Sequence, residues 1–163
     1  MTTAAIQTPA IPAGVTFSHR DILGLTVDCP GISECGRAFT LGMWSATLAH
    51  LDDALVRDPD YDYEHHSDPV EIPTQWAPSC VSGMISEGLG WMAEHAAALQ
   101  VVGVPPAVVA GFLGVCYGRA RSGQHQDVSL EWLGQPCVWD SLLALDWWPL
   151  RVSMDGSTIL WEE

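Results

Sequence analysis

The segment 96–118 constrains the fold of this chain more than any other, because it contains no charged side chain. Its length would be enough for a helix to cross a lipid bilayer. However, Pro105 and Pro106 interrupt it, and proline inside a helix removes a backbone donor and clashes with the preceding turn. We therefore expect two buried helices that are separated at the prolines. A membrane-associated segment 96–118 is the minor alternative.

The second of these helices, predicted over 105–118, has small residues on one face. They recur at intervals of three or four residues, which places them on the same side of a helix. Small side chains at this spacing allow the backbone of another helix to approach closely. They are Ala107, Gly111, Gly114 and Gly118, of which the three glycines are predicted contact residues.

The first helix, predicted over 83–102 with Ser82 as its N-cap, carries a tryptophan among charged residues. Its apolar residues recur with helical periodicity and should form one buried stripe. Trp91 lies outside that stripe, between Glu87 and Glu94 on the polar side. We therefore predict that these three residues contact a partner. The stripe consists of Ile85, Leu89, Met92, Ala96 and Leu99.

A third helix is predicted over 38–56, and the last third of the chain is predicted to be β structure. The helix has an apolar stripe, and the clearest strands form a hairpin over 150–161. Asp155-Gly156, flanked by alternating apolar residues, is typical of a two-residue turn. The helical stripe is Trp44, Leu48, Leu51 and Leu55, and the hairpin pairs Leu150 with Trp161 and Val152 with Ile159.

These elements predict an α+β fold with two or three helices packed on a small antiparallel sheet that includes the C-terminal hairpin. A chain of 163 residues is long enough to bury one core. Residues 15–163 would form this single domain. Residues 1–14, rich in Thr, Ala and Pro, would form an extended N-terminal arm that reaches onto a neighbour.

The charged residues exclude several functions. The chain contains no lysine, and its 20 acidic residues against six arginines give a net charge of −14. Schiff-base chemistry through lysine and a P-loop lysine are therefore excluded. Nucleic-acid binding needs clustered cations, so we expect no nucleic-acid partner. The charge suits solubility or a basic protein partner.

The five cysteines and the first residues predict the compartment. The number of cysteines is odd, and the N-terminus has neither the basic region nor the long apolar region of a signal peptide. We therefore expect free thiols in the cytoplasm, or in a particle assembled there. Cys29 or Cys80 could act as a nucleophile with a distant histidine, whereas Cys116 should be a core thiol.

The acidic segment 58–73 is the best candidate for a metal site. Its alternating carboxylates resemble a calcium loop, but Tyr63 replaces the turn glycine and Pro69 replaces the final glutamate. Its paired histidines could instead hold zinc or another divalent ion. A solvated loop without a cofactor is the expectation. The weak metal candidates are Asp60, Asp62, Glu64, His65 and His66.

The eight tryptophans favour a role in binding. Trp147 and Trp148 are adjacent and, like Trp91, do not fit one buried stripe. Tryptophan is frequent among the residues that dominate binding energy. We therefore expect a non-catalytic structural or interaction protein, a subunit of a larger assembly such as a viral particle. It would bind a protein partner or further copies of itself.

Two other functions remain open at this point. The first is an acidic inhibitor or immunity-type protein whose segment 58–71 binds a basic enzyme, with a steep dependence on salt. The second is a small enzyme, either metal-dependent through Asp62, His65 and His66 or based on a cysteine.

Overall fold

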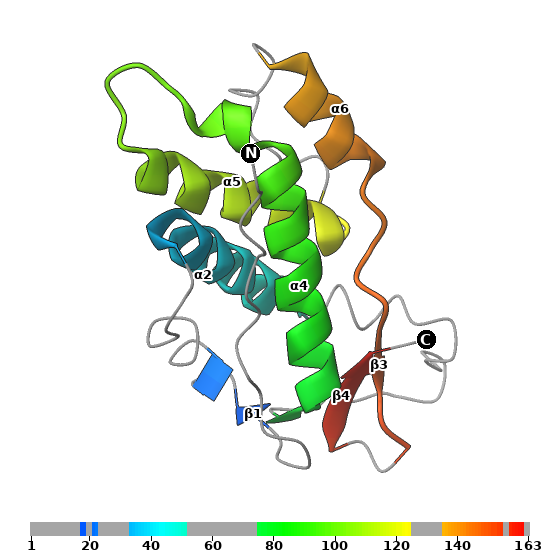
Figure 1. The fold of residues 1–163 in the computed structure, drawn as a ribbon. Coiled ribbons are helices and arrows are strands. Elements are labelled where there is room, and N and C mark those ends of the chain that lie inside the picture. Colours follow the sequence, from blue (N-terminus) through cyan, green and yellow to red (C-terminus); the bar gives the residue numbers. More distant parts are fainter. Residues whose placement is uncertain are drawn as a thin grey trace.

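The computed structural model describes residues 17–18, 21–22, 33–51, 75–124, 135–154 and 157–161, which form an α+β fold (Figure 1). The helices are α2 (Glu34–Ala49), α4 (Pro78–Glu94), α5 (Pro106–Arg121) and α6 (Pro136–Ala144), and the 3₁₀ helix η1 (Ala96–Leu99) follows α4. The strands are β1 (Phe17–Ser18), β2 (Gln75–Trp76), β3 (Leu150–Val152) and β4 (Thr158–Trp161).

Helix α2 begins earlier than the predicted residue 38, because Ser33 caps it. The Gly36 N–H donates a hydrogen bond to Ser33 Oγ at 3.0 Å, which satisfies one of the free donors at the helix start. Of the predicted stripe, Trp44 and Leu51 are buried and Leu48 is half-buried, as expected. Leu55 lies outside the described residues.

Helices α2 and α5 lie side by side and run in the same direction (Figure 1). Gly114 lies against the backbone of Phe39, and Gly118 lies against the backbone of Met43. A Cβ atom at either glycine would come within 3.0 Å of those backbones. The predicted close approach of a second backbone is confirmed, and that backbone belongs to the same chain.

Helix α4 packs on this pair, and its first turn meets the sheet (Figure 1). The strand order is β1-β2-β4-β3. The predicted hairpin is confirmed, including its register, because Leu150 pairs with Trp161 and Val152 pairs with Ile159. The sheet is mixed rather than antiparallel throughout, since β2 pairs with β4 in parallel.

Two predictions of local structure were wrong. Helix α4 begins at Pro78, without Ser82 as its cap, and ends at Glu94 rather than near residue 102. Helix α6 lies in a region that was predicted to be β structure. Its buried residues Val138 and Leu142 are one helical turn apart, and this spacing is the helical signal in the sequence.

The minor membrane alternative has no support in the described part of the chain. No helix there is both long enough and apolar enough to span a bilayer. The segment 96–118 is instead divided among η1, an exposed loop and most of α5.

Candidate functional site

Trp91 lies in the core, so the prediction of an exposed contact residue was wrong. It is 8% exposed, and its ring packs against the rings of Phe39 and Tyr117. Its indole N–H donates to Ser141 Oγ of α6 at 2.8 Å. Helix α4 has a second buried face. Hydrophobic periodicity does not reveal it, because one of its three members is a glycine. That face consists of Met84, Gly88 and Trp91.

Trp148 is also a core residue rather than an interface residue. It is 3% exposed, and its indole N–H donates to Thr47 Oγ1 at 3.2 Å. The Tyr117 ring meets it edge-on at 5.6 Å between centroids. Of the three tryptophans predicted to contact a partner, Trp147 alone is exposed, at 46%.

The predicted contact residues Glu87 and Glu94 differ in their surroundings. The Glu87 carboxylate accepts a hydrogen bond from the Arg121 guanidinium at 2.5 Å. Arg121 also donates to the Asp146 carbonyl oxygen at 3.0 Å, and its guanidinium lies 4.3 Å from the Trp148 ring centroid. Glu87 therefore holds a buried cation of its own chain, whereas Glu94 is exposed at the end of α4.

The predicted contact glycines of α5 pack against α2 of the same chain. Gly114 and Gly118 face α2 at distances that leave no room for another helix, and Gly111 lies against Ala38. The small-residue face of α5 is therefore not available to a partner.

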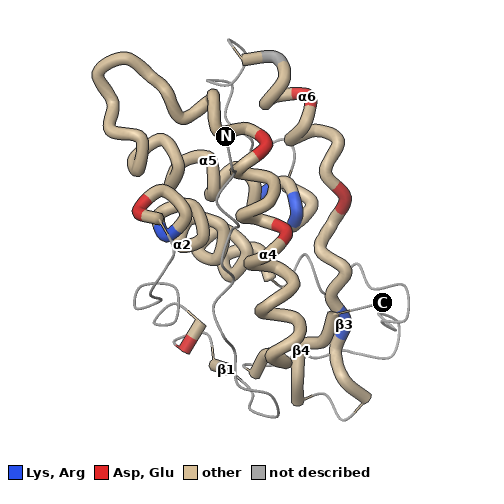
Figure 2. The backbone as a smooth tube through the Cα atoms, in the orientation of Figure 1, with Lys and Arg blue, Asp and Glu red and all other residues tan. Residues whose placement is uncertain are grey.

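An exposed apolar segment, the apolar loop 101–108, consists of the connection after η1 and the first residues of α5. Its exposure differs from the prediction, in which the helices of the apolar segment 96–118 are buried. Residues 101–106 are all exposed, and Gly103 turns the chain with a φ of 78°, a conformation that favours glycine. The loop projects from the helices (Figure 1), and Figure 2 shows no charged residue along it. Its exposed valines are Val101, Val102, Val104 and Val108.

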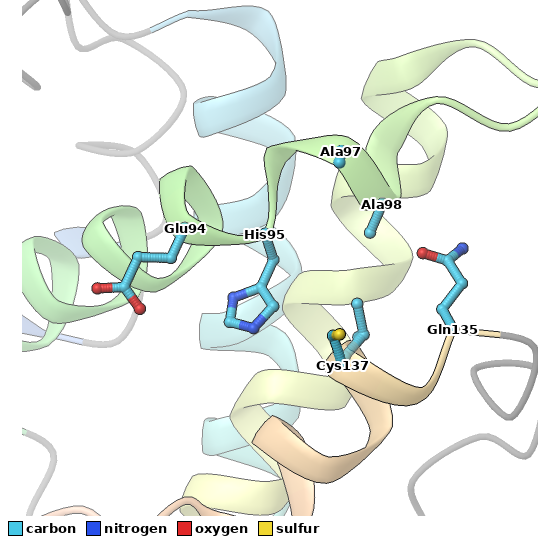
Figure 3. Close-up of a pocket in the computed structure, with 7 residues that line it drawn as sticks. Glu94, His95, Ala97, Ala98, Gln135 and Cys137 are labelled. Carbon is cyan, nitrogen blue, oxygen red and sulfur yellow. The ribbon is translucent and has the colours of Figure 1, made fainter.

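A pocket of about 320 Å³ lies between the end of α4, η1 and the start of α6. Figure 3 shows the His95 ring and the Cys137 side chain entering it from different elements, whereas the Glu94 carboxylate points away. The pocket is lined by Glu94, His95, Ala97, Ala98, Gln135, Cys137 and Val138.

Two contacts fix the orientation of His95. Its Nδ1 lies 2.8 Å from the Trp91 carbonyl oxygen, and its ring stacks on the Trp91 ring at 4.2 Å between centroids. A carbonyl can only accept a hydrogen bond, so we assign the proton of the neutral ring to Nδ1. Nε2 then keeps its lone pair and can accept a proton or bind a ligand.

The predicted metal residues Asp60, Asp62, Glu64, His65 and His66 lie outside the described residues, as do Cys29 and the arm 1–14. Among the residues that are described, no group of three or more His, Cys, Asp or Glu side chains could hold a metal ion.

Cys80 is buried, and burial raises the pKa of its thiol from 9.0 to about 12. A nucleophilic cysteine needs the thiolate, so burial opposes the predicted role of Cys80. Cys116 is buried in α5, as expected for a core thiol. Cys137 lines the same pocket as His95, which the sequence could not indicate because the two residues are far apart along the chain.

The raised pKa of Cys80 predicts a loss of stability at alkaline pH. In the unfolded chain the thiol releases its proton near pH 9.0, whereas in the folded chain it keeps the proton to about pH 12. The free energy of unfolding should therefore be at its full value below pH 9 and fall as the pH rises toward 12. Burial also raises the pKa of Tyr117, from 10.0 to about 12, which adds to the loss above pH 10.

Urea unfolding between pH 8 and pH 10 tests this prediction, because the chain has no lysine to titrate there. The Cys80→Ala variant should show a shallower decline between pH 9 and pH 10 than the original chain. An identical decline in both proteins would contradict the assignment. The comparison uses the slope, since the cavity left by alanine lowers stability equally at each pH.

In comparisons with known proteins, no family model, no curated protein and no solved structure matches this chain. Within the part of the chain that the structure describes, two surface features remain on which a function can rest, namely the apolar loop 101–108 and the pocket lined by His95 and Cys137.

Proposed function

We propose that this chain is a non-catalytic interaction protein, a subunit of a larger assembly, and that it docks through the apolar loop 101–108. Six consecutive exposed residues without a charge, in a chain of net charge −14, carry this proposal. Contiguous exposed apolar surface of this kind is typical of protein contact sites.

The loop is suited to insertion into a partner. It begins after η1 and ends in the first turn of α5, which packs closely on α2, so both of its ends are held by the core. Pro105 and Pro106 restrict its backbone, which reduces the entropy that binding would cost. Because Val102 is fully exposed and no side chain in the loop carries a charge, the loop fits an apolar recess on a second protein or on another copy of this chain.

The contact surface that we propose differs from the one expected from the sequence. Trp91 and Trp148 are core residues, and the glycine face of α5 is filled by α2. Trp147 remains exposed and can belong to the same contact or to another one. Replacing a core tryptophan would unfold the domain rather than test an interface.

Val102→Asp tests the proposal, and Met154→Asp is its matched control. Both residues are fully exposed and apolar, but Met154 follows β3, a strand at the opposite end of the structure from the loop (Figure 1). Each change should alter the free energy of unfolding by no more than about 0.5 kcal/mol, as is usual for surface residues. Native mass spectrometry of the untagged chain from its own source reports the assembly.

We expect the original chain and the Met154→Asp variant to be found in an oligomer or in a complex with a second protein. The Val102→Asp variant should be found as a monomer, because the loop would have to bury an unpaired carboxylate. Assembly that survives Val102→Asp, or an original chain that is a bare monomer, would contradict docking through the loop.

The inhibitor and the metal-dependent enzyme receive no support from the described residues, and burial opposes Cys80 as the nucleophile of a cysteine enzyme. The acidic segment 58–71 that an inhibitor would use and the residues of a metal-dependent enzyme lie outside the described residues.

A further inference from the structure

We propose that Cys137 and His95 form a nucleophilic thiol–imidazole pair that captures small, uncharged α,β-unsaturated carbonyl compounds in the pocket between α4 and α6. This site is independent of the apolar loop and does not rest on the proposed function.

The two reacting groups lie on different parts of the fold and line one pocket (Figure 3). Cys137 is exposed, at the second residue of α6, so a small molecule can reach its sulfur. His95 follows α4 and is held by the Trp91 carbonyl and the Trp91 ring. Such an anchor on Nδ1 is the usual way in which a protein presents Nε2 as a base to a neighbouring group.

The step that this pair supports is an addition. The Cys137 proton passes to His95 Nε2, and the sulfur forms a bond to the β-carbon of the ligand. The electron pair of the carbon–carbon double bond moves toward the carbonyl oxygen, and the imidazolium then returns the proton to the α-carbon. The sum is the addition of S–H across one double bond, which needs no oxidant and releases no leaving group.

The rest of the pocket indicates the class of ligand. Ala97, Ala98 and Val138 provide apolar contacts, and the Gln135 amide provides an N–H donor for a carbonyl oxygen on which charge develops. Glu94 at the rim and the net charge of −14 oppose anionic ligands. A volume of about 320 Å³ admits a small molecule but no peptide of appreciable length.

The experiment measures the rate at which N-ethylmaleimide labels individual cysteines, resolved by peptide mass spectrometry. Cys35 is the internal control, because it is the second residue of α2, as Cys137 is of α6, so both thiols lie at a helix N-terminus. The variant is His95→Asn, whose side-chain amide can still donate to the Trp91 carbonyl but cannot accept the thiol proton. His95→Gln is the second variant.

We expect the labelling rate of Cys137 to fall by about tenfold or more in both variants. A general base usually contributes more than this to a rate, so the threshold is a modest one. The rate at Cys35 should stay within about twofold of its original value, which shows that the fold is intact. An unchanged rate at Cys137 in His95→Asn and His95→Gln would overturn the pairing. Equal slowing at Cys35 and Cys137 would also overturn it, since the effect would then be general.

Discussion

Replacing Gly114 with alanine is expected to lower the free energy of unfolding by about 3 kcal/mol, the upper part of the range for overpacked cores. The added Cβ would overlap the carbonyl oxygen, the carbonyl carbon and the Cα of Phe39. These are backbone atoms of α2, which cannot turn aside as a flexible side chain can. To accommodate one methyl group, α2 and α5 would have to separate along their contact.

Gly90 and Gly111 provide matched controls for this prediction. A Cβ at Gly90 would meet no atom within 4 Å, and at Gly111 the nearest atom, the Ala38 carbonyl oxygen, lies at 3.7 Å. Both glycines lie inside helices, where alanine is favoured over glycine by about 1 kcal/mol. Gly90→Ala and Gly111→Ala should therefore be neutral or stabilising, and urea unfolding followed by tryptophan fluorescence compares all three variants. A Gly114→Ala variant as stable as these two would show that the helices do not meet at this face.

The glycine spacing shows how much of the fold the sequence could predict. Residues 111, 114 and 118 lie on one helical face whatever surrounds them, so the close contact could be predicted. The partner could not, because nothing in the spacing distinguishes α2 from a helix of another chain. The hairpin was predicted to its register for a similar reason, since alternation and a turn dipeptide are local signals.

Trp91 shows why the surface could not be predicted as well. Periodicity identified one buried stripe on α4, but this helix packs against α2 and α5 and also donates a bond to α6, so it buries two faces. The second face includes Gly88, where a Cβ would lie 2.7 Å from the Met43 sulfur, so a glycine there indicates close packing rather than exposure. Residues 101–106 show the reverse error, because their apolar sequence predicted burial and the structure exposes them.

The candidate pocket could not be predicted from the sequence, because His95 and Cys137 belong to elements that only the tertiary fold brings together. Local patterns, such as adjacent residues or helical spacing, cannot relate His95 to Cys137, because the two residues are distant in the sequence. One signal was present, since Pro136 is favoured at the first position of a helix and so marks the start of α6.

Replacing Arg121 with alanine is expected to lower the free energy of unfolding by about 3 kcal/mol, because it removes a charged hydrogen bond, a cation–π contact and the packing of a long buried side chain. The Arg121 side chain is 10% exposed, and it binds the Glu87 carboxylate, the Asp146 carbonyl and the face of Trp148. Alanine would remove all three interactions and leave a cavity beside the tryptophan. The Asp146 carbonyl would lose its donor.

Glu87→Gln is the matched change on the other side of the pair, and it should cost no more than about 1 kcal/mol. The Glu87 side chain is 49% exposed, so water screens its charge, and glutamine retains an oxygen that can accept from Arg121. The double variant should be as stable as Arg121→Ala alone, because Glu87 without its partner is already hydrated. Chemical unfolding of the two single variants and the double variant completes the cycle. If Glu87→Gln cost as much as Arg121→Ala, the ion pair itself, rather than the carbonyl and the tryptophan, would be what holds Arg121 in the core.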